Sequence, residues 1–186
     1  MTINDIKLEA LKLMFLNYSE DISDVNALTT DENYSAYIMN MNGAINRALG
    51  RFWAKRVIHK MFKPLPSAFE GIDDNLDLCD YCFAITETEE AEIRESVKAE
   101  YPDLTEELLQ VKQDLAVALE KENRRTLVPI DAQLLIPYWI KADLYEEDEP
   151  ALSAQARNIF EQGIEDRQYE DAQDCIENVF RSGWLG

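Results

Sequence analysis

Apolar residues recur every three or four positions along most of this 186-residue chain, which is the spacing of an amphipathic α-helix. On this basis helices are predicted over residues 4–18, 87–100, 104–122, 131–145, 150–165 and 169–180. A further helix, the second in chain order, is predicted to begin at a cap at Thr30 or Asp31 and to end before a loop at 63–77. Prolines or polar residues occupy the breaks between them. The pattern therefore predicts a mainly α protein.

Two predicted helices carry a continuous apolar stripe. In the second helix the stripe is Tyr34, Ile38, Met41, Ile45, Leu49 and Phe52, and in the helix at 104–122 it is Leu104, Leu108, Val111, Leu115, Ala118 and Glu122, with Leu119 adjoining. Gly43 and Gly50 interrupt the second helix, and each glycine either allows close packing or permits a bend. Both segments are predicted to be amphipathic helices.

Two local features modify this helical picture. Residues 78–85 are short and rich in aromatic side chains, which predicts a strand. Asp131 is expected to cap the helix at 131–145, and Pro137 is expected to kink it by removing one backbone hydrogen bond. The prediction is a helical bundle of about five to seven helices, with a small β element in the middle region and an extended C-terminal arm. The helical domain covers 1–167, with an acidic, insertion-like middle region at 64–126, and the arm covers 168–186.

The net charge of −19 is distributed unevenly along the chain. Residues 1–63 carry eight basic and seven acidic groups, whereas residues 64–186 carry ten basic and thirty acidic groups. Arg47, Arg51 and Lys55 form an i, i+4 row on one face of the second predicted helix. The chain therefore has one basic surface against an acidic background.

Two interpretations of these charges remain open. In the first, the basic cluster and the acidic cluster are each a solvated face that keeps the protein soluble. Alternatively, the basic face of one copy meets an acidic face of another, for which Glu146, Glu147 and Asp148 are candidates opposite Arg47, Arg51 and Lys55. Such a head-to-tail contact closes into a ring when the rotation between copies permits.

The sequence offers little catalytic chemistry. Cys79 and Cys82 form a CxxC that serves in other proteins as half of a zinc site or as a redox pair, but only Cys175 and His59 remain to complete a ligand set. The competing interpretation is two half-buried small residues on one short strand. No nucleotide-binding, metalloprotease or serine-hydrolase motif is found in the sequence. We therefore expect a protein that is not an enzyme and that binds no cofactor or metal.

The chain ends suggest a soluble protein with an exposed C-terminal anchor. The first residues lack the basic and apolar regions of a signal peptide, and no stretch is apolar and long enough to cross a bilayer. An odd number of cysteines argues against a secreted disulfide framework. We expect cytoplasmic synthesis and no membrane partner. Trp184 and Leu185 lie too near the end to enter a core easily, so they are candidates for contact with a partner.

Two segments resemble a known family when they are taken together. The first contains Tyr37, Met41, Gly43, Ala44, Ile45, Asn46, Arg47 and Ala48, and is similar to a signature M-x-G-x-I-N-R. The second covers residues 134–150, followed by Ala154, Ala156 and Arg157, and resembles a signature LIPY-aromatic-IK-x-x-LYEEDEP. Both are signatures of the head–tail connector proteins of tailed bacteriophages. Residues 1–15 also resemble the opening helix of that family. Residues 64–126 depart from that family, and the chain past about 167 does not align with it.

The resemblance implies a structural subunit of the virion neck. Such connectors form a ring, typically of twelve copies, beneath the portal protein, extend the DNA channel and support the next neck or tail protein. A C-terminal arm that grips the portal would give Val179, Phe180, Trp184 and Leu185 a role in portal contact. An acidic channel lining repels phosphate and lets DNA slide, so proximity to DNA would be non-specific. The alternative is an acidic DNA mimic or inhibitory protein that occupies a basic groove.

Overall fold

The computed structural model describes residues 1–15, 24–67 and 73–182, with only the backbone described for 170–182. The elements in chain order are α1 (Ile3–Met14), η1 (Val25–Leu28), α2 (Ser35–Ala54), α3 (Leu78–Cys82), α4 (Glu87–Glu100), α5 (Glu106–Arg125), α6 (Ile130–Gln133), α7 (Ile136–Leu144) and α8 (Pro150–Ser182). The predicted mainly α class is confirmed. Among these residues the one β pairing is an isolated bridge between Thr2 and Asp77.

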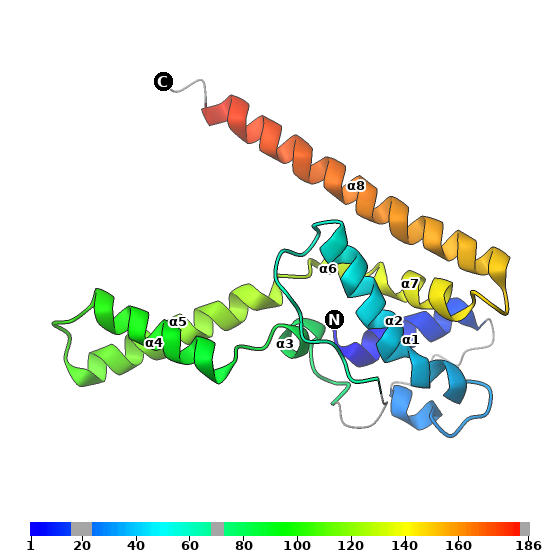
Figure 1. Ribbon diagram of the computed structural model, residues 1–186, viewed down its shortest axis with the longest axis horizontal. Coiled ribbons are helices and arrows are strands. Elements are labelled where there is room, and N and C mark those ends of the chain that lie inside the picture. The colour runs from blue at the N-terminus through cyan, green and yellow to red at the C-terminus, as the bar shows by residue number, and fades with distance from the viewer. Residues whose placement is uncertain (16–23, 68–72, 183–186) are drawn as a thin grey trace.

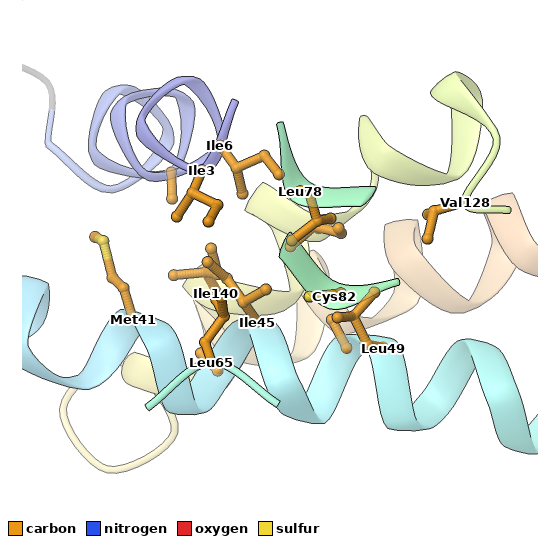
Figure 2. Packing of buried hydrophobic residues seen from close by; sticks show 14 of the residues in the cluster. Ile3, Ile6, Met41, Ile45, Leu49, Leu65, Leu78, Cys82, Val128 and Ile140 are labelled. Carbon is orange, nitrogen blue, oxygen red and sulfur yellow. The ribbon is translucent and has the colours of Figure 1, made fainter. Parts of the chain in front are cut away.

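α1, α2, α7 and the first half of α8 pack into one body (Figure 1). Side chains from four elements meet in its interior: Ile3 and Ile6 of α1, Met41, Ile45 and Leu49 of α2, Leu78 and Cys82 of α3, and Ile140 of α7 (Figure 2). Phe160 brings α8 into the same core by stacking on Phe52, with ring centroids 5.3 Å apart. Burial of these apolar side chains is the main source of stability in the body.

A charged pair lies inside this body. Lys7 of α1 and Asp74 are both buried, and their Nζ and Oδ1 atoms are 2.8 Å apart. Burial lowers the pKa of Lys7, while its hydrogen bond to Asp74 and the charge of that carboxylate act in the opposite direction. The backbone N–H of Asn4 also donates to the carbonyl of Asp74, at 2.8 Å. These contacts fasten α1 to the segment that precedes α3.

α2 begins later than the predicted cap at Thr30 or Asp31. The Asp31 carboxylate instead accepts a hydrogen bond from the N–H of Asn33 at 2.8 Å, in a turn that precedes the helix. The predicted apolar stripe of α2 is confirmed, since every member from Ile38 to Phe52 is fully buried. Gly50 faces open space, so close packing does not explain it.

Residues 78–82 form a helix, so the predicted strand over 78–85 is wrong. Asp77 caps this helix, because its side chain accepts a hydrogen bond from the N–H of Cys79 at 2.8 Å. Leu78, Cys79 and Cys82 then project into the core at helical spacing. A run this short fits the spacing of a helix or of a strand, so the sequence alone does not distinguish the two. Here the helix is the form that buries Leu78, Cys79 and Cys82 together.

The helix predicted over 131–145 is two helices, α6 and α7, so Pro137 does not kink a continuous helix. Pro137 lies in the first turn of α7, where a missing backbone N–H has no partner to lose. Asp131 lies inside α6, whose N-cap is Pro129. The helices predicted over 150–165 and 169–180 are one helix, α8, which includes residues 168–182 of the predicted arm.

α4 and α5 form a hairpin that projects from the body (Figure 1). The bounds of α4 agree with the prediction, and Thr86 and Glu89 cap it reciprocally through side chain and backbone. α4 has no buried residue, and α5 has two, Val117 and Arg124. The hairpin therefore adds little to the core. In the described part of the chain no helix is both long and apolar enough to cross a membrane.

Candidate functional site

The basic row of α2 lies against acidic side chains of α7 and α8. Arg47 donates from Nε to Oδ1 of Asp143 at 2.8 Å, and its second nitrogen, Nη2, contacts the other carboxylate oxygen. Arg51 donates from Nε to Glu161 at 2.7 Å, and the Nζ of Lys55 lies 3.8 Å from the same carboxylate. The bond to Asp143 raises the pKa of Arg47, and the bond to Glu161 raises that of Arg51. All three predicted basic residues therefore have acidic partners within the chain.

The predicted acidic residues lie at the turn between α7 and α8. Glu146 forms an ion pair with Arg157 of α8 at 3.3 Å, and Asp148 accepts a hydrogen bond from the hydroxyl of Tyr37 at 3.5 Å. Glu147 is exposed and has no ion pair in the part of the chain described. Of the six candidate residues for contact between copies, the three basic ones thus lie on α2, where they pair with α7 and α8, and the three acidic ones lie in the turn between α7 and α8.

The two segments that resemble the connector signatures are in direct contact. Arg47 belongs to the first and Asp143 to the second, and their paired contact joins α2 to α7. Gly43 belongs to the first segment, and a Cβ there would lie 3.3 Å from Nη1 of Arg47. The small residue thus leaves room for the guanidinium group that reaches Asp143.

Asn46, from the same segment, fixes the loop after α2. Its side-chain amide donates to the carbonyl of Leu65 at 2.8 Å, and its side-chain oxygen accepts from the N–H of Leu65 at 2.7 Å. Asn46 therefore pairs with the backbone of Leu65 in both directions, which places Leu65 in the core. Spacing in the sequence places Asn46 and Arg47 on α2 but does not indicate these partners.

The CxxC cysteines are buried in the body. Burial raises the pKa of Cys79 to about 11 and that of Cys82 to about 12. Burial therefore disfavours the thiolate, which is the nucleophilic form of cysteine, at both positions. Among the described side chains no group of three His, Cys, Asp or Glu is placed to hold a metal ion. The side chain of Cys175 lies outside the described ones, and His59 is exposed beyond the end of α2.

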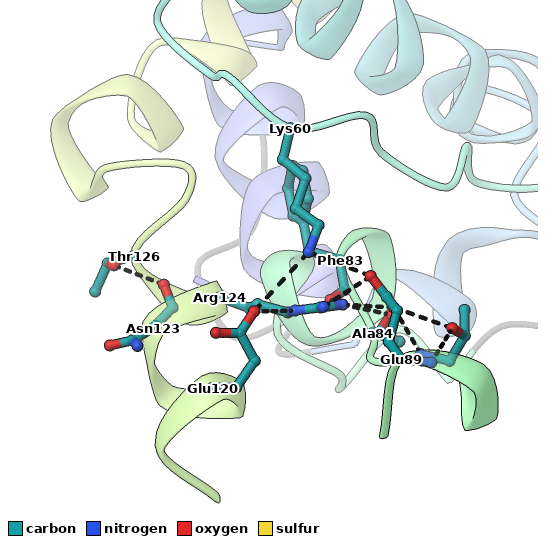
Figure 3. A network of polar contacts seen from close by, with 9 residues as sticks. Lys60, Phe83, Ala84, Glu89, Glu120, Asn123, Arg124 and Thr126 are labelled. Atoms are coloured by element: carbon teal, nitrogen blue, oxygen red, sulfur yellow. Dashed lines mark hydrogen bonds and ion pairs between the residues drawn. The ribbon is translucent and has the colours of Figure 1, made fainter. Parts of the chain in front are cut away.

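One network was not predicted from the sequence and joins the hairpin to the body (Figure 3). The guanidinium group of Arg124 is nearly buried and donates to Glu89, to Glu120 and to the carbonyls of Phe83 and Ala84, at 2.8–3.2 Å. Lys60 approaches both carboxylates, at 3.4 and 3.9 Å. Hydrogen bonds from Arg124 hold the pKa of Glu89 well below its usual range. A buried arginine with these partners fixes the base of the hairpin.

The candidate portal contacts fall at the end of α8. Val179 and Phe180 lie on its last two turns, and nothing is described of their side chains. Trp184 and Leu185 lie outside the described residues. Comparisons with protein-family models, with characterised proteins and with solved structures find no match to this chain.

Proposed function

We propose that this chain is a head–tail connector subunit, which forms a ring beneath a phage portal, extends the DNA channel and supports the next neck or tail protein. One observation carries the proposal: the two segments that resemble connector signatures, about ninety residues apart, form one packed and ion-paired unit through Arg47 and Asp143. The body of α1, α2, α7 and α8 is then the connector framework.

The length of α8 supports a contact at some distance from the body. A helix of 33 residues is about 50 Å long, and its ribbon continues past α7 (Figure 1). It would carry residues 180–186 to the portal, with Val179, Phe180, Trp184 and Leu185 as the contact residues. The excess of acidic groups suits a channel that DNA passes without binding.

Electron microscopy of the protein mixed with the portal protein of the same genome tests the proposal. The expected result is a ring of this chain, of about twelve copies, on the portal. A protein that stays free of the portal at every concentration tried would contradict it. Capture by the free chain of a nucleic-acid enzyme, weakened by salt, would instead favour the DNA-mimic alternative.

Deleting residues 180–186 tests the portal contact separately. The truncated protein should keep the circular dichroism spectrum and melting temperature of the full chain but lose portal attachment. The matched control is Met39→Ser, which alters an exposed apolar residue on α2 instead. Equal attachment by the truncated and full chains would remove the assignment of the C-terminus while leaving the ring itself open to microscopy.

A further inference from the structure

α5 carries an apolar face that nothing in the described chain covers. Its exposed members, here called the hairpin stripe, are Leu108, Val111, Leu115 and Leu119. Each is between 56% and 67% exposed, and together they occupy one side of three consecutive turns. α4 packs on the other side of α5, where Val117 and Arg124 are buried. An apolar face of this size, held rigidly by the network around Arg124, is typical of a protein contact surface.

The segment after α2 offers an apolar surface of a different kind. Trp53 is 50% and Met61 is 74% exposed, and between them lie Arg56 and His59, also exposed. Together with Lys63 these residues are called the basic patch. Trp53, Ala54, Arg56, Ile58 and His59 line a depression of about 410 Å³. Arg56 has a φ of 61° and ends α2 in a left-handed cap, since the N–H of Val57 donates to the carbonyl of Phe52 at 2.8 Å.

The charges of these two surfaces are complementary. Residues 33–69 contain no acidic group, whereas residues 86–125 contain twelve acidic and six basic groups. At the hairpin tip, beside Leu108, four acidic residues form no ion pair with the described residues: Glu100, Asp103, Glu106 and Glu107. Arg56 likewise has no ion pair there. The hairpin stripe thus combines exposed apolar side chains with neighbouring acids, and the basic patch combines exposed apolar side chains with neighbouring bases. The two surfaces are therefore complementary in charge and alike in apolar character.

We propose that the hairpin stripe of one copy docks on the basic patch of a second copy of this chain. Within one molecule neither surface covers the other, because the apolar side chains of both are half exposed or more. Among the exposed large apolar residues described, Trp53 and Met61 are the ones set between basic residues. The two surfaces differ, so the contact is head-to-tail and leaves a free stripe and a free patch at the ends of any dimer.

This inference rests on the connector proposal and names the contact by which its ring would be built. It differs from the contact between copies considered in the sequence analysis, in which the basic row of α2 meets Glu146, Glu147 and Asp148. The basic row of α2 (Arg47, Arg51 and Lys55) already has acidic partners on α7 and α8. The basic patch lies at and just after the end of α2, and its apolar side chains are exposed.

Sedimentation equilibrium of the full chain, without portal, tests the contact through three variants. The stripe variant is Leu108→Ser with Leu115→Ser, and the patch variant is Trp53→Ser with Met61→Ser. The control, Met39→Ser with Ile130→Ser, alters two exposed apolar residues elsewhere. Exposed sites tolerate such changes, so all three should melt near the wild type. The wild type and control should associate as concentration rises, and each of the other variants should associate at least about tenfold more weakly.

A mixture decides between head-to-tail and symmetric pairing. The stripe variant keeps an intact patch and the patch variant an intact stripe, so an equal mixture should form a one-to-one dimer that grows no further. Growth of the patch variant alone would overturn the proposal in favour of stripe-to-stripe pairing. A wild type that stays monomeric at the highest concentration, or variants that associate like the wild type, would also overturn it. Rings of the stripe variant on the portal would refute this contact but leave the connector function standing.

Discussion

α2 and α5 are both twenty residues long and both carry an apolar stripe at helical spacing, yet their surroundings are opposite. The stripe of α2 is buried, with α7 packed on α2 and Phe160 of α8 stacked on Phe52, whereas that of α5 faces solvent. Periodicity therefore specifies that a segment forms a helix with an apolar side, but it does not specify what covers that side. In the body the cover is the same chain, and on the hairpin we propose that it is a second copy.

The largest difference between the two regions is expected in their ion pairs. Lys7→Met removes one partner of a buried pair and leaves the carboxylate of Asp74 uncompensated, at a cost of about 3–5 kcal/mol in the free energy of unfolding. Urea denaturation measures this cost. The double variant with Asp74→Leu should recover most of the stability, because two apolar groups replace the pair.

The matched change in the hairpin is Arg94→Met, which removes an ion pair with Asp114 between α4 and α5. That pair lies at the surface, so the loss should be clearly smaller than for Lys7→Met. Equal losses would show that the hairpin depends on its charges as much as the body does.

The same substitution in both stripes tests the comparison directly. Leu49→Ala opens a cavity in the body and should cost about 2–5 kcal/mol. Leu115→Ala removes side-chain atoms that are already in water and should change stability by less than about 0.5 kcal/mol. Denaturation at low protein concentration, where copies are separate, provides the measurement. A large loss from Leu115→Ala would mean that α5 is covered within the monomer.

The sequence predicted more of the framework than of the contacts. The stripe of α2 and the bounds of α4 follow from apolar spacing and a capping threonine, which are local features. The failed strand at 78–85 is also local, because Asp77 can cap a helix and a short apolar run fits either structure. Lys7 repeats at helical spacing with Ile3 and Leu11, so its burial left a signal in the sequence.

The partners of these residues could not be predicted in the same way. Asp74 lies 67 residues after Lys7, outside any periodic segment, and its pairing depends on how the loop before α3 meets α1. The basic row of α2 was predicted correctly as one face. Its partners, Asp143 and Glu161, depend on the docking of α7 and α8, which a pattern of spacing does not determine.

The junction between the two regions should show an intermediate effect. Arg124→Ala removes the donor that the guanidinium supplies to two backbone carbonyls and to the carboxylates of Glu89 and Glu120, at a cost of about 2 kcal/mol. Hydrogen exchange should show the loss mainly as faster opening of α4 and α5, with the body protected. Uniform loss of protection in both regions would contradict a separately opening hairpin.

The stability that the pair of Arg124 and Glu89 contributes should depend on pH. The pKa of Glu89 is lower in the folded chain than in the unfolded chain, so the folded state binds fewer protons in the interval between the two values. Its stabilising contribution is complete above the ordinary glutamate pKa of about 4.3 and is lost as the pH falls through the lower, folded value. Acid should therefore reduce the stability difference between the wild type and Arg124→Ala. A difference that does not change between pH 7 and pH 3 would argue against this pairing.

The smallest effect separates two glycines on the helices of the body. Gly50 of α2 has no atom within 4 Å of an added Cβ, so Gly50→Ala should stabilise the protein by about 0.5–1 kcal/mol through its better helix propensity. In α8 a Cβ at Gly163 would lie 2.6 Å from Cδ2 of Leu135, so Gly163→Ala gains the same propensity but must displace that side chain. Melting temperatures should therefore rise for the first variant and rise less, or fall, for the second. Equal gains would mean that Leu135 moves aside at no cost.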